Sequence, residues 1–373
     1  MARSLVAQGV HVDVATTDDD GPGGRLAVPL SQRIEREGYG VFYFRKQTEF
    51  YKVSLPFCRW LAARVADYDL VHIHTVFSYT STVAARWSRR QGVPYIVRPL
   101  GVLNRWGMVN RRRLIKSLSF RFVEQPLLRR AAAMHYTSRA EQREAEQTGA
   151  TAPAAVIPLG LDLAAFERLP GAERFLNQFP QARGRVLVLF LSRLDPKKGL
   201  DLLLPAFAEA RRHYPSAMLV VAGNGEQNFV AGLHDRASQL GLAQDLVWAG
   251  FLSGEDKLAA FAAASVFMLP SYSENFGIAL IEAMAAGLPC LATPGVAVAE
   301  DLQTCAPDAL LVAPAEVKPL AEALGRLLGD AAGRAQLGAK ARQVASAHFS
   351  LSAMGTALRE LYSKVQKGSQ DRR

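Results

Sequence analysis

Two carboxylates stand in a stretch of the sequence that is otherwise apolar or made of small residues. The stretch, LPSYSENFGIALIEAMAAGLP, covers residues 269–289 and carries Glu274 and Glu282. Carboxylates are rarely buried without a partner, because the loss of their hydration costs free energy. The two acids are therefore candidates for binding a polar ligand.

The elements around these acids suggest which ligand they meet. Pro270 ends an apolar strand, and the helix that carries Glu282 is expected to begin near Phe276 or Gly277. The free N–H groups and the positive dipole end of a helix start stabilise a phosphate group, and a glycine there lets the ligand come close to the backbone. The candidate ligand-binding positions at this helix start are Asn275, Phe276, Gly277 and Ile278.

Neutral hydroxyl groups are the expected partners of Glu274 and Glu282. A carboxylate repels phosphate, whereas a ribose and a hexose both offer paired hydroxyls. Combined with a phosphate at the helix start, this points to a nucleotide sugar. The alternative is structural: Glu274 caps the helix, and Glu282 pairs with a surface lysine or arginine.

Cations are expected opposite these acids, and the segment SRLDPKKGLD supplies them. Arg193 and Lys198 lie where an apolar strand ends and the next helix begins, which is the edge at which ligands bind in doubly wound folds. The planar fork of an arginine and the point charge of a lysine suit a diphosphate. The glycine turn AGNGEQ, with Gly223 and Gly225, follows the next strand, although a tight connection explains it equally well.

Histidines and acids in the first half give weaker signals. DLVHIH puts His72 and His74 on one face of a strand, and no further ligand is spaced nearby to complete a metal site. His72 is expected to be a core residue, and His74 to face a crevice between two domains and bond a sugar hydroxyl. The turn TTDDDGPGG, residues 16–24, is expected to be a solvated acidic turn rather than a metal site.

Short apolar runs alternate with helical segments along the whole chain. The runs expected to form strands are VHVDVAT, DLVHIH, PYIVRP, AMHYTS and AAVIP in the first half, and VLVLFLSRL, AMLVVAG, LVWAG, SVFMLP, LPCLAT and ALLVAP in the second. Continuous apolar strands separated by helices predict parallel sheets covered on both faces, and two such series predict an α/β fold of two doubly wound domains. The stretch 159–185 carries Pro, Gly and charge without a strand pattern and is expected to be the linker. The predicted domains are residues 1–165 and 166–349, and a C-terminal helix within 350–373 is expected to pack back on the first domain.

The composition fits an ordinary globular protein large enough for two cores. The chain has 373 residues, of which 49% are hydrophobic. Its three cysteines are far apart, which argues against a disulfide framework and favours a reducing cytoplasm. Neither an N-terminal apolar signal segment nor a run of about 18 apolar residues occurs, so the sequence predicts no membrane span.

The net charge of +10 comes almost entirely from the first half of the chain. Between Arg86 and Arg130, twelve basic residues face the single acid Glu124. A solvated helix face is the plain explanation. The other is an anion-facing surface, and the absence of a nucleic-acid-binding pattern argues against nucleic acid as the partner. Anionic lipid headgroups attract basic residues by about 1 kcal/mol each, so we favour a membrane surface.

These motifs resemble those of the retaining glycosyltransferases of the GT-B fold, in the large family 4. The resemblance runs from about Ala2 to Tyr362, and its most specific element is the glutamate-x7-glutamate motif, here Glu274 and Glu282. SRLDPKKG resembles the family's arginine–lysine phosphate clamp, and VHIH, AGNG and FLSGEDKLAAFAAASVFMLPS match in order and spacing. YIVRPLGVLNRW resembles a segment that many bacterial polysaccharide-assembling members carry.

The resemblance implies two Rossmann-like domains facing a central crevice and a role for each candidate residue. Glu282 would hold the ribose of the donor and Glu274 the hydroxyls of the transferred sugar. Arg193 and Lys198 would hold the diphosphate, and His74 matches the crevice histidine that contacts the sugar. The family works without a metal, and its same-face attack, helped by the departing phosphate, requires no side-chain nucleophile. No cofactor is therefore expected.

One departure from the family concerns the N-terminus. Family members normally begin with a strand and a glycine-rich loop before the helix that corresponds to ARSLVAQG, and both are expected to be missing here. The expected function is a metal-independent, retaining hexosyl transfer from a nucleoside-diphosphate sugar to a hydroxyl of a lipid-linked glycan or polysaccharide precursor. The expected location is the cytoplasm, peripherally at the plasma membrane. The alternative is a catalytically idle member that binds a nucleotide sugar or a partner enzyme as a scaffold.

Overall fold

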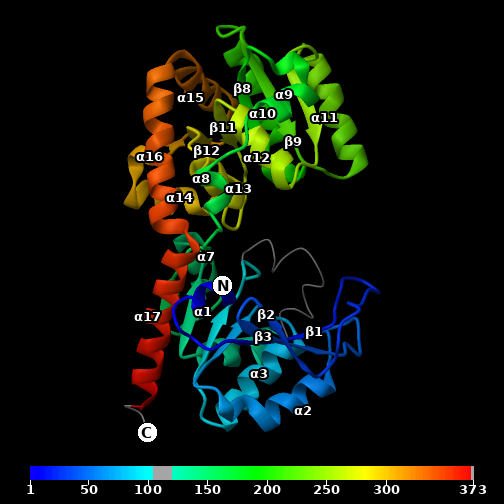
Figure 1. The fold of residues 1–373 in the computed structure, drawn as a ribbon, viewed down its shortest axis with the longest axis vertical. Coiled ribbons are helices and arrows are strands. Elements are labelled where there is room, and N and C mark those ends of the chain that lie inside the picture. The colour runs from blue at the N-terminus through cyan, green and yellow to red at the C-terminus, as the bar shows by residue number, and fades with distance from the viewer. Residues whose placement is uncertain (104–119, 371–373) are drawn as a thin grey trace. The chain divides into compact units, whose positions relative to one another are not determined.

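The structure is a computed structural model that describes residues 1–103 and 120–370 (Figure 1). It divides into two compact units. The first contains residues 1–160 together with the C-terminal helix α17 (Leu351–Gln370), and the second contains residues 161–350. Within the described ranges, no helix combines the length and the apolar character needed to cross a membrane.

The first unit is an α/β structure with two small sheets. Its elements before α17 are α1 (Ala2–Val6), β1 (Asp13–Thr17), β2 (Arg33–Arg36), β3 (Tyr39–Phe44), α2 (Leu55–Arg64), β4 (Val71–His74), α3 (Tyr79–Arg90), β5 (Tyr95–Arg98), α6 (Gln125–Arg129), β6 (Ala133–Tyr136), α7 (Arg139–Glu146) and β7 (Ala154–Val156). The larger sheet has the order β4-β5-β6-β7, with every neighbouring pair parallel. The smaller sheet has the order β1-β3-β2.

The smaller sheet contains two strands that the apolar runs did not predict. β1 and β3 are parallel, whereas β2 and β3 form an antiparallel pair. Three of the four residues of β2 are exposed, so this edge strand carries no apolar run. β3 is buried through Phe42 and Phe44, which pack on Trp60 of α2 with ring centroids 4.8 and 5.5 Å apart.

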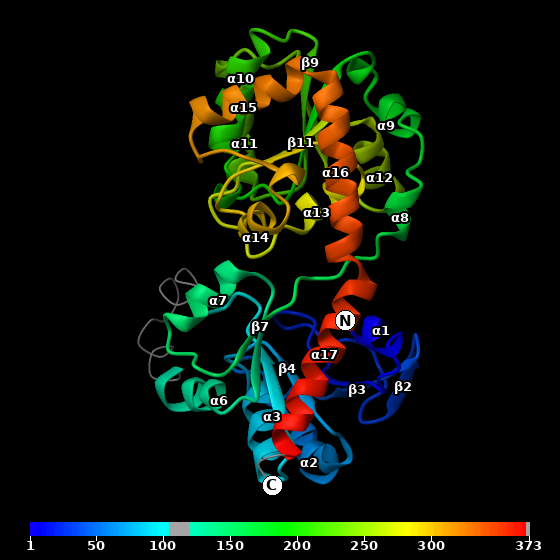
Figure 2. The same ribbon diagram turned by 90° about the vertical axis from the view of Figure 1, so that its left-hand side faces the viewer.

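The sheet β4-β5-β6-β7 is covered on both faces, because successive side chains of a strand point to opposite sides. Ile73, Val97 and Met134 belong to the core on one face, which also includes buried residues of α2, α3 and α6. Ile96 and Ala133 belong to the core on the other face, with residues of α1 and α17. Figures 1 and 2 both show α17 lying alongside α1.

The second unit is a single doubly wound domain. Its elements are α8 (Ala164–Glu167), α9 (Glu173–Gln178), β8 (Val186–Leu191), α10 (Leu200–Arg211), β9 (Ala217–Ala222), α11 (Gln227–Gln239), β10 (Leu246–Gly250), α12 (Gly254–Ala263), β11 (Val266–Leu269), α13 (Ile278–Ala285), β12 (Cys290–Ala292), α14 (Ala297–Cys305), β13 (Leu311–Val312), α15 (Val317–Gly329) and α16 (Ala331–Phe349). The strand order is β10-β9-β8-β11-β12-β13, and all pairs are parallel. Figure 2 shows α10, α11 and α15 on one side of this sheet and α12, α13 and α16 on the other.

Each apolar run that the sequence marked as a strand forms one, and the predicted α/β class with two Rossmann-like units is confirmed. The stretch 159–185 is not the linker that the sequence predicted. From Leu161 onward this stretch folds with the second unit, where Phe166 of α8 packs on Phe261 of α12 and Phe175 of α9 is 2% exposed. The strand pattern is absent there because the segment forms short helices.

Candidate active site

The strand order of the second unit reverses direction between β8 and β11. From β8 the chain proceeds outward through β9 and β10, and it then returns to the other side of β8 to continue through β11, β12 and β13. Ligands of doubly wound sheets bind beyond the carboxyl ends of the strands at such a switch point. The loops at this edge are residues 192–199 after β8 and 270–277 after β11.

Glycines let these loops approach one another more closely than any other residue would allow. A Cβ atom on Gly199 would lie 2.0 Å from the carbonyl oxygen of Pro270, and one on Gly223, in the loop after β9, would lie 1.8 Å from that of Ser192. Both glycines have positive φ, 70° and 144°. Tyr272 N donates to the carbonyl oxygen of Lys197 at 2.8 Å, which joins the loops after β8 and β11 directly.

Lys198 and Glu274 meet at this edge. Lys198 ends a 3₁₀ turn (Pro196–Lys198) that Asp195 caps, and its ammonium group donates to a carboxylate oxygen of Glu274. The two side chains are 8% and 23% exposed. A mostly buried lysine requires a counter-charge, and the acid supplies it. The structure therefore brings together one predicted cation and one predicted acid from different loops.

Glu282 and Arg193 have different surroundings. Lys257 Nζ on α12 donates to Oε1 of Glu282 at 2.7 Å, so the pairing with a lysine that the sequence left open as the alternative is present. Lys257 lies in the motif FLSGEDKL, and no local signal identified it as the partner. Arg193 is exposed just beyond the end of β8, and within the described chain it forms no ion pair.

The start of α13 forms part of the same edge. Gly277 is the N-terminal cap, with φ 105° and without a side-chain capping bond, and a Cβ there would lie 2.7 Å from Val296. Ile278 and Asn275 are exposed. The side chain of Phe276 is 4% exposed and packs against Phe349, so only the backbone of this predicted binding residue can reach a ligand.

The glycine turn after β9 is tightly packed against the loop after β8. A Cβ on Gly225 would lie 2.2 Å from the carbonyl oxygen of Leu194, and Leu194 N donates to the carbonyl oxygen of Asn224 at 2.8 Å. Gly223 and Gly225 are therefore required by the close approach of two loops, whether or not they also contact a ligand.

His74 belongs to the first unit, at the carboxyl end of β4. Its ring lies 4.9 Å from that of His72, and it reaches solvent. Loss of hydration, followed by the positive charges of Arg98 and of the N-terminal ammonium group, lowers the pKa of His74 to about 4, so the ring is neutral near pH 7. Its role in contacting a sugar remains a prediction.

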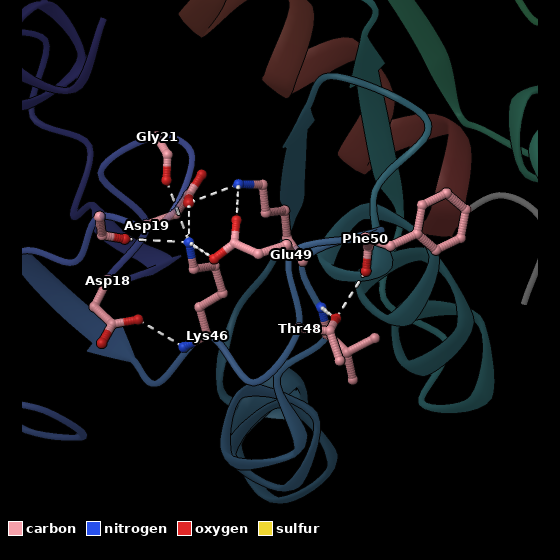
Figure 3. Close-up of polar contacts among 10 residues, drawn as sticks. Asp18, Asp19, Gly21, Lys46, Thr48, Glu49 and Phe50 are labelled. Atoms are coloured by element: carbon pink, nitrogen blue, oxygen red, sulfur yellow. Dashed lines mark hydrogen bonds and ion pairs between the residues drawn. The ribbon is translucent and has the colours of Figure 1, made fainter. Parts of the chain in front are cut away.

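The acidic turn of residues 16–24 is not the solvated turn that the sequence predicted. Asp18 is 3% exposed and accepts from the backbone N–H of Lys46 at 2.6 Å. Figure 3 shows the side chain of Lys46 reaching Asp19, Glu49 and the carbonyl of Gly21. Two lysines, Lys46 and Lys52, therefore pair with Asp19, a backbone N–H satisfies Asp18, and of the three acids only Asp20 is exposed as predicted.

Not every described basic residue between Arg86 and Arg130 lies on the surface. Arg86, Arg89 and Arg90 on α3 are exposed, as are Arg121, Arg129 and Arg130 around α6. Arg98, which the charge count placed in the same region, is buried. Residues 104–119, with the RRR run at 111–113, lie outside the described residues.

A bound metal ion requires several ligating side chains that lie close together. Among the described residues, no group of three or more His, Cys, Asp or Glu side chains could hold a metal ion. Independence from a metal cofactor remains a prediction.

Comparisons with known proteins agree on the family. Residues 172–344 match the family Glycosyl transferases group 1, and residues 1–160 match the family Glycosyl transferase 4-like domain. The chain is 30% identical over 292 residues to 2-deoxystreptamine glucosyltransferase of Streptomyces kanamyceticus, which covers 73% of this chain and 74% of that protein. It is also 30% identical over 235 residues to the GDP-mannose-dependent alpha-(1-6)-phosphatidylinositol monomannoside mannosyltransferase of Mycolicibacterium smegmatis, with 61% of each protein covered. The chain thus spans about three-fifths of the length of this second relative.

Solved structures share the fold. Sucrose-phosphate synthase from Thermosynechococcus elongatus has a TM-score of 0.73 at 23% identity, with 98% of this chain and 92% of that chain covered. HepE of Anabaena, in complex with UDP-glucose, has a TM-score of 0.71 at 20% identity, with 95% and 100% covered. Together with the two Rossmann-like units, these likenesses define the GT-B architecture. The chain belongs to the GT-B glycosyltransferases of family 4, the glycosyl transferases group 1.

Proposed function

We propose that the chain transfers a hexose, with retention of anomeric configuration, from a nucleoside-diphosphate sugar to a hydroxyl of a lipid-linked glycan or polysaccharide precursor. The observation that carries the proposal is the pair of Lys198 and Glu274 at the switch point between β8 and β11. A mostly buried cation and an acid stand side by side at the edge where a doubly wound domain binds nucleotides.

Donor binding would exchange the partners of this pair. The diphosphate would take the ammonium group of Lys198 and the exposed guanidinium of Arg193, because both bind phosphate oxygens through charge-assisted hydrogen bonds. Glu274 would then be released to accept from hydroxyls of the transferred sugar. The two residues that pair with each other in the structure would thus bind opposite parts of the donor.

The helix α13 supports the remainder of the donor. Its first turn, uncapped at Gly277, would meet the phosphates through backbone N–H groups. Glu282 would accept from the ribose hydroxyls while keeping or sharing its bond to Lys257. Rate enhancement would come from positioning and from stabilising the charge of the departing diphosphate, which also takes the proton of the attacking hydroxyl.

The exposed positive charge of the first unit supports the proposal of a lipid-linked acceptor. One relative is named for transfer to a phosphatidylinositol mannoside, and the exposed arginines of α3 and α6 would attract anionic headgroups by about 1 kcal/mol each. Charge reversal of Arg86 and Arg89 should weaken sedimentation with anionic liposomes by at least about tenfold, as two such contributions imply. Reversal of Arg236, exposed on α11, should leave it unchanged. Equal sedimentation of both variants would rule out this membrane surface.

A donor panel tests the proposed reaction. UDP-, GDP- and ADP-sugars would be ranked by the rise in melting temperature, because a ligand at a hundred times its Kd adds about 2.7 kcal/mol to the free energy of unfolding. The best donor would then be assayed for transfer to polyprenyl- and phosphatidylinositol-linked glycans, and the anomeric configuration of the product determined by NMR.

The variants of this experiment are Lys198→Met and Lys340→Ala. Lys198→Met should lose the donor response, whereas Lys340→Ala, at an exposed position of α16, should keep it. A chain that no nucleotide sugar stabilises would refute donor binding. A chain that binds a donor but neither hydrolyses nor transfers it would be a scaffold member of the family instead.

A further inference from the structure

Among the described residues of the first unit, one buried cation has no hydrogen-bonded counter-charge. Arg98, the last residue of β5, is 6% exposed, and its Nε has no hydrogen-bond partner. Burial lowers the pKa of Arg98, and removing an unpaired charge from water costs several kcal/mol. Lys46, which is 1% exposed, shows the usual solution, since carboxylates and carbonyl oxygens surround its ammonium group (Figure 3).

The acid that acts on Arg98 most strongly is already engaged elsewhere. Glu141 on α7 favours the charged form of Arg98 electrostatically. Its Oε1 accepts from Gly101 N at 2.6 Å, and its Oε2 accepts from the backbone N–H and the hydroxyl of Thr137 at 2.7 and 2.8 Å. These bonds hold the loop after β5 against α7. Within the described chain, no ion pair joins Glu141 to the guanidinium.

The N-terminal ammonium group of Met1 is a second positive charge near Arg98, and its pKa is lowered by burial and by the charge of Arg98. The histidines and the tyrosine on the other side are neutral. The carbonyl oxygen of Ile157 can only accept, so Nε2 of His135, 3.0 Å away, carries a proton. Nδ1 of His135 then accepts from Nε2 of His72 at 3.3 Å, and Nδ1 of His72 accepts from the hydroxyl of Tyr362 at 2.8 Å. This relay consumes the hydrogen-bonding capacity of both rings. Burial lowers the pKa of each histidine, so neither adds charge.

Arg98 lies at the carboxyl end of a parallel strand, the edge of the sheet at which ligands bind in doubly wound folds. His74 and Arg98 are directly paired at the carboxyl ends of β4 and β5, and the exposed ring of His74 marks access from solvent. The loops that follow contain three non-glycine residues with positive φ, at 68° for Thr75, 59° for Phe77 and 59° for Leu100. Such strained residues cluster at functional sites, each at a cost of about 1–3 kcal/mol.

We propose that Arg98 anchors an anion-binding site of the first unit, which takes a phosphate or carboxylate group of the glycosyl acceptor, with His74 at its entrance. A guanidinium binds such groups through two parallel hydrogen bonds, here from its two terminal nitrogens, because the Nε atom itself is buried. The neutral ring of His74 can donate to or accept from a neighbouring acceptor hydroxyl. The proposal rests on the proposed transfer reaction, in which Arg193 and Lys198 of the second unit already provide for the donor diphosphate.

Inorganic phosphate is the probe for this site. The full chain would be saturated with the nucleoside diphosphate that stabilises it most, which occupies the donor cations, and then titrated with phosphate while the melting temperature is recorded. Arg98→Met should require at least about tenfold more phosphate for the same shift, as the loss of a charge-assisted bond implies. Arg36→Met, at an exposed position of β2, should respond like the unchanged chain.

Two further readings separate the possible roles of Arg98. Without phosphate, Arg98→Met should melt at the same or a higher temperature, because an uncompensated charge is removed, and its affinity for the nucleoside diphosphate should be unchanged. A tenfold loss of that affinity would assign Arg98 to the donor and overturn the acceptor site. A phosphate response equal to that of the unchanged chain would overturn the site altogether.

A measurement on the unchanged chain avoids any failure of the variant to fold. Phosphate should slow hydrogen exchange of the peptide covering residues 96–103, and the same protection should occur in Lys198→Met, where the donor site is impaired. Protection that disappears in Lys198→Met would place the phosphate at the donor site. The hydrogen-exchange measurement gives a result even if no nucleotide sugar binds. It therefore distinguishes failure of the anion site from failure of the proposed function.

Discussion

Replacing Glu274 by glutamine should strengthen the binding of a free nucleoside diphosphate and slow the transfer of the sugar. The acid now holds the ammonium group of Lys198, and the two side chains are 23% and 8% exposed. To bind Lys198, a nucleoside diphosphate must break the bond between Lys198 and this carboxylate. The negative charge of the carboxylate also repels the phosphates. Glu274→Gln keeps the shape of the side chain and removes the charge, so the phosphates should meet a less tightly held lysine.

The expected gain follows from the strength of the pair. A partly exposed ion pair contributes about 1 kcal/mol, and a change of that size is about fivefold in Kd. The variant should therefore bind the free nucleoside diphosphate about fivefold more tightly. Transfer of the sugar should fall by about tenfold or more, because a hydrogen bond from a hydroxyl to a charged acceptor contributes about 1.5–3 kcal/mol.

Isothermal titration with the nucleoside diphosphate and steady-state transfer assays measure the two effects. Glu322→Gln, which removes one acidic charge at an exposed position of α15 in the same unit, is the matched control and should alter neither. Weaker binding of the diphosphate to Glu274→Gln would show that Glu274 does not compete for Lys198. Undiminished transfer would show that the acid does not touch the sugar.

Three further predictions concern the donor edge and the buried histidines. Glu282→Gln should weaken the binding of a free nucleoside and of its diphosphate alike, by about 1.5 kcal/mol each in calorimetric titrations. A loss of affinity confined to the diphosphate would show that Glu282 does not contact the ribose. Gly277→Ala should lower the free energy of unfolding by about 1–3 kcal/mol, since φ is 105° and the new Cβ would lie 2.7 Å from a valine methyl; Gly171→Ala, in open space, should have little effect in the same urea titration. Burial lowers the pKa of His135 to about 3, below the unfolded value of about 6.5. The unfolded chain therefore binds more protons as the pH falls, and stability should decrease below about pH 6.5 by up to about 1.4 kcal/mol per pH unit; His135→Gln should flatten this decrease, and an unchanged slope would contradict it.

The sequence predicted the second unit well because its strands are buried on both faces. β9, β11 and β12 are buried at every residue, so apolar runs mark them clearly, and the residues that follow such runs reach the binding edge. The prediction missed β2 because three of its four residues face solvent. Lys257 could not be identified from spacing, since its bond to Glu282 joins two helices that only the packed domain brings together.

Arg98 shows where a signal was present but was interpreted differently. It ends an apolar strand, as Arg193 follows one, yet its place among twelve basic residues suggested a charged surface. Burial separates it from that surface. Asp18 and Asp19 were likewise taken as solvated, because the partner Lys46 lies 27 residues from Asp19 in the sequence. Pairings between distant residues depend on the fold and are not encoded in local composition.

A crystal structure of the chain with a bound nucleoside diphosphate tests most directly whether the donor is held at the switch point of the second unit. The diphosphate should contact Lys198 and the first turn of α13, the ribose hydroxyls should contact Glu282, and Glu274 should have left Lys198. A nucleotide bound elsewhere, with the Lys198–Glu274 pair intact, would contradict the proposed donor site.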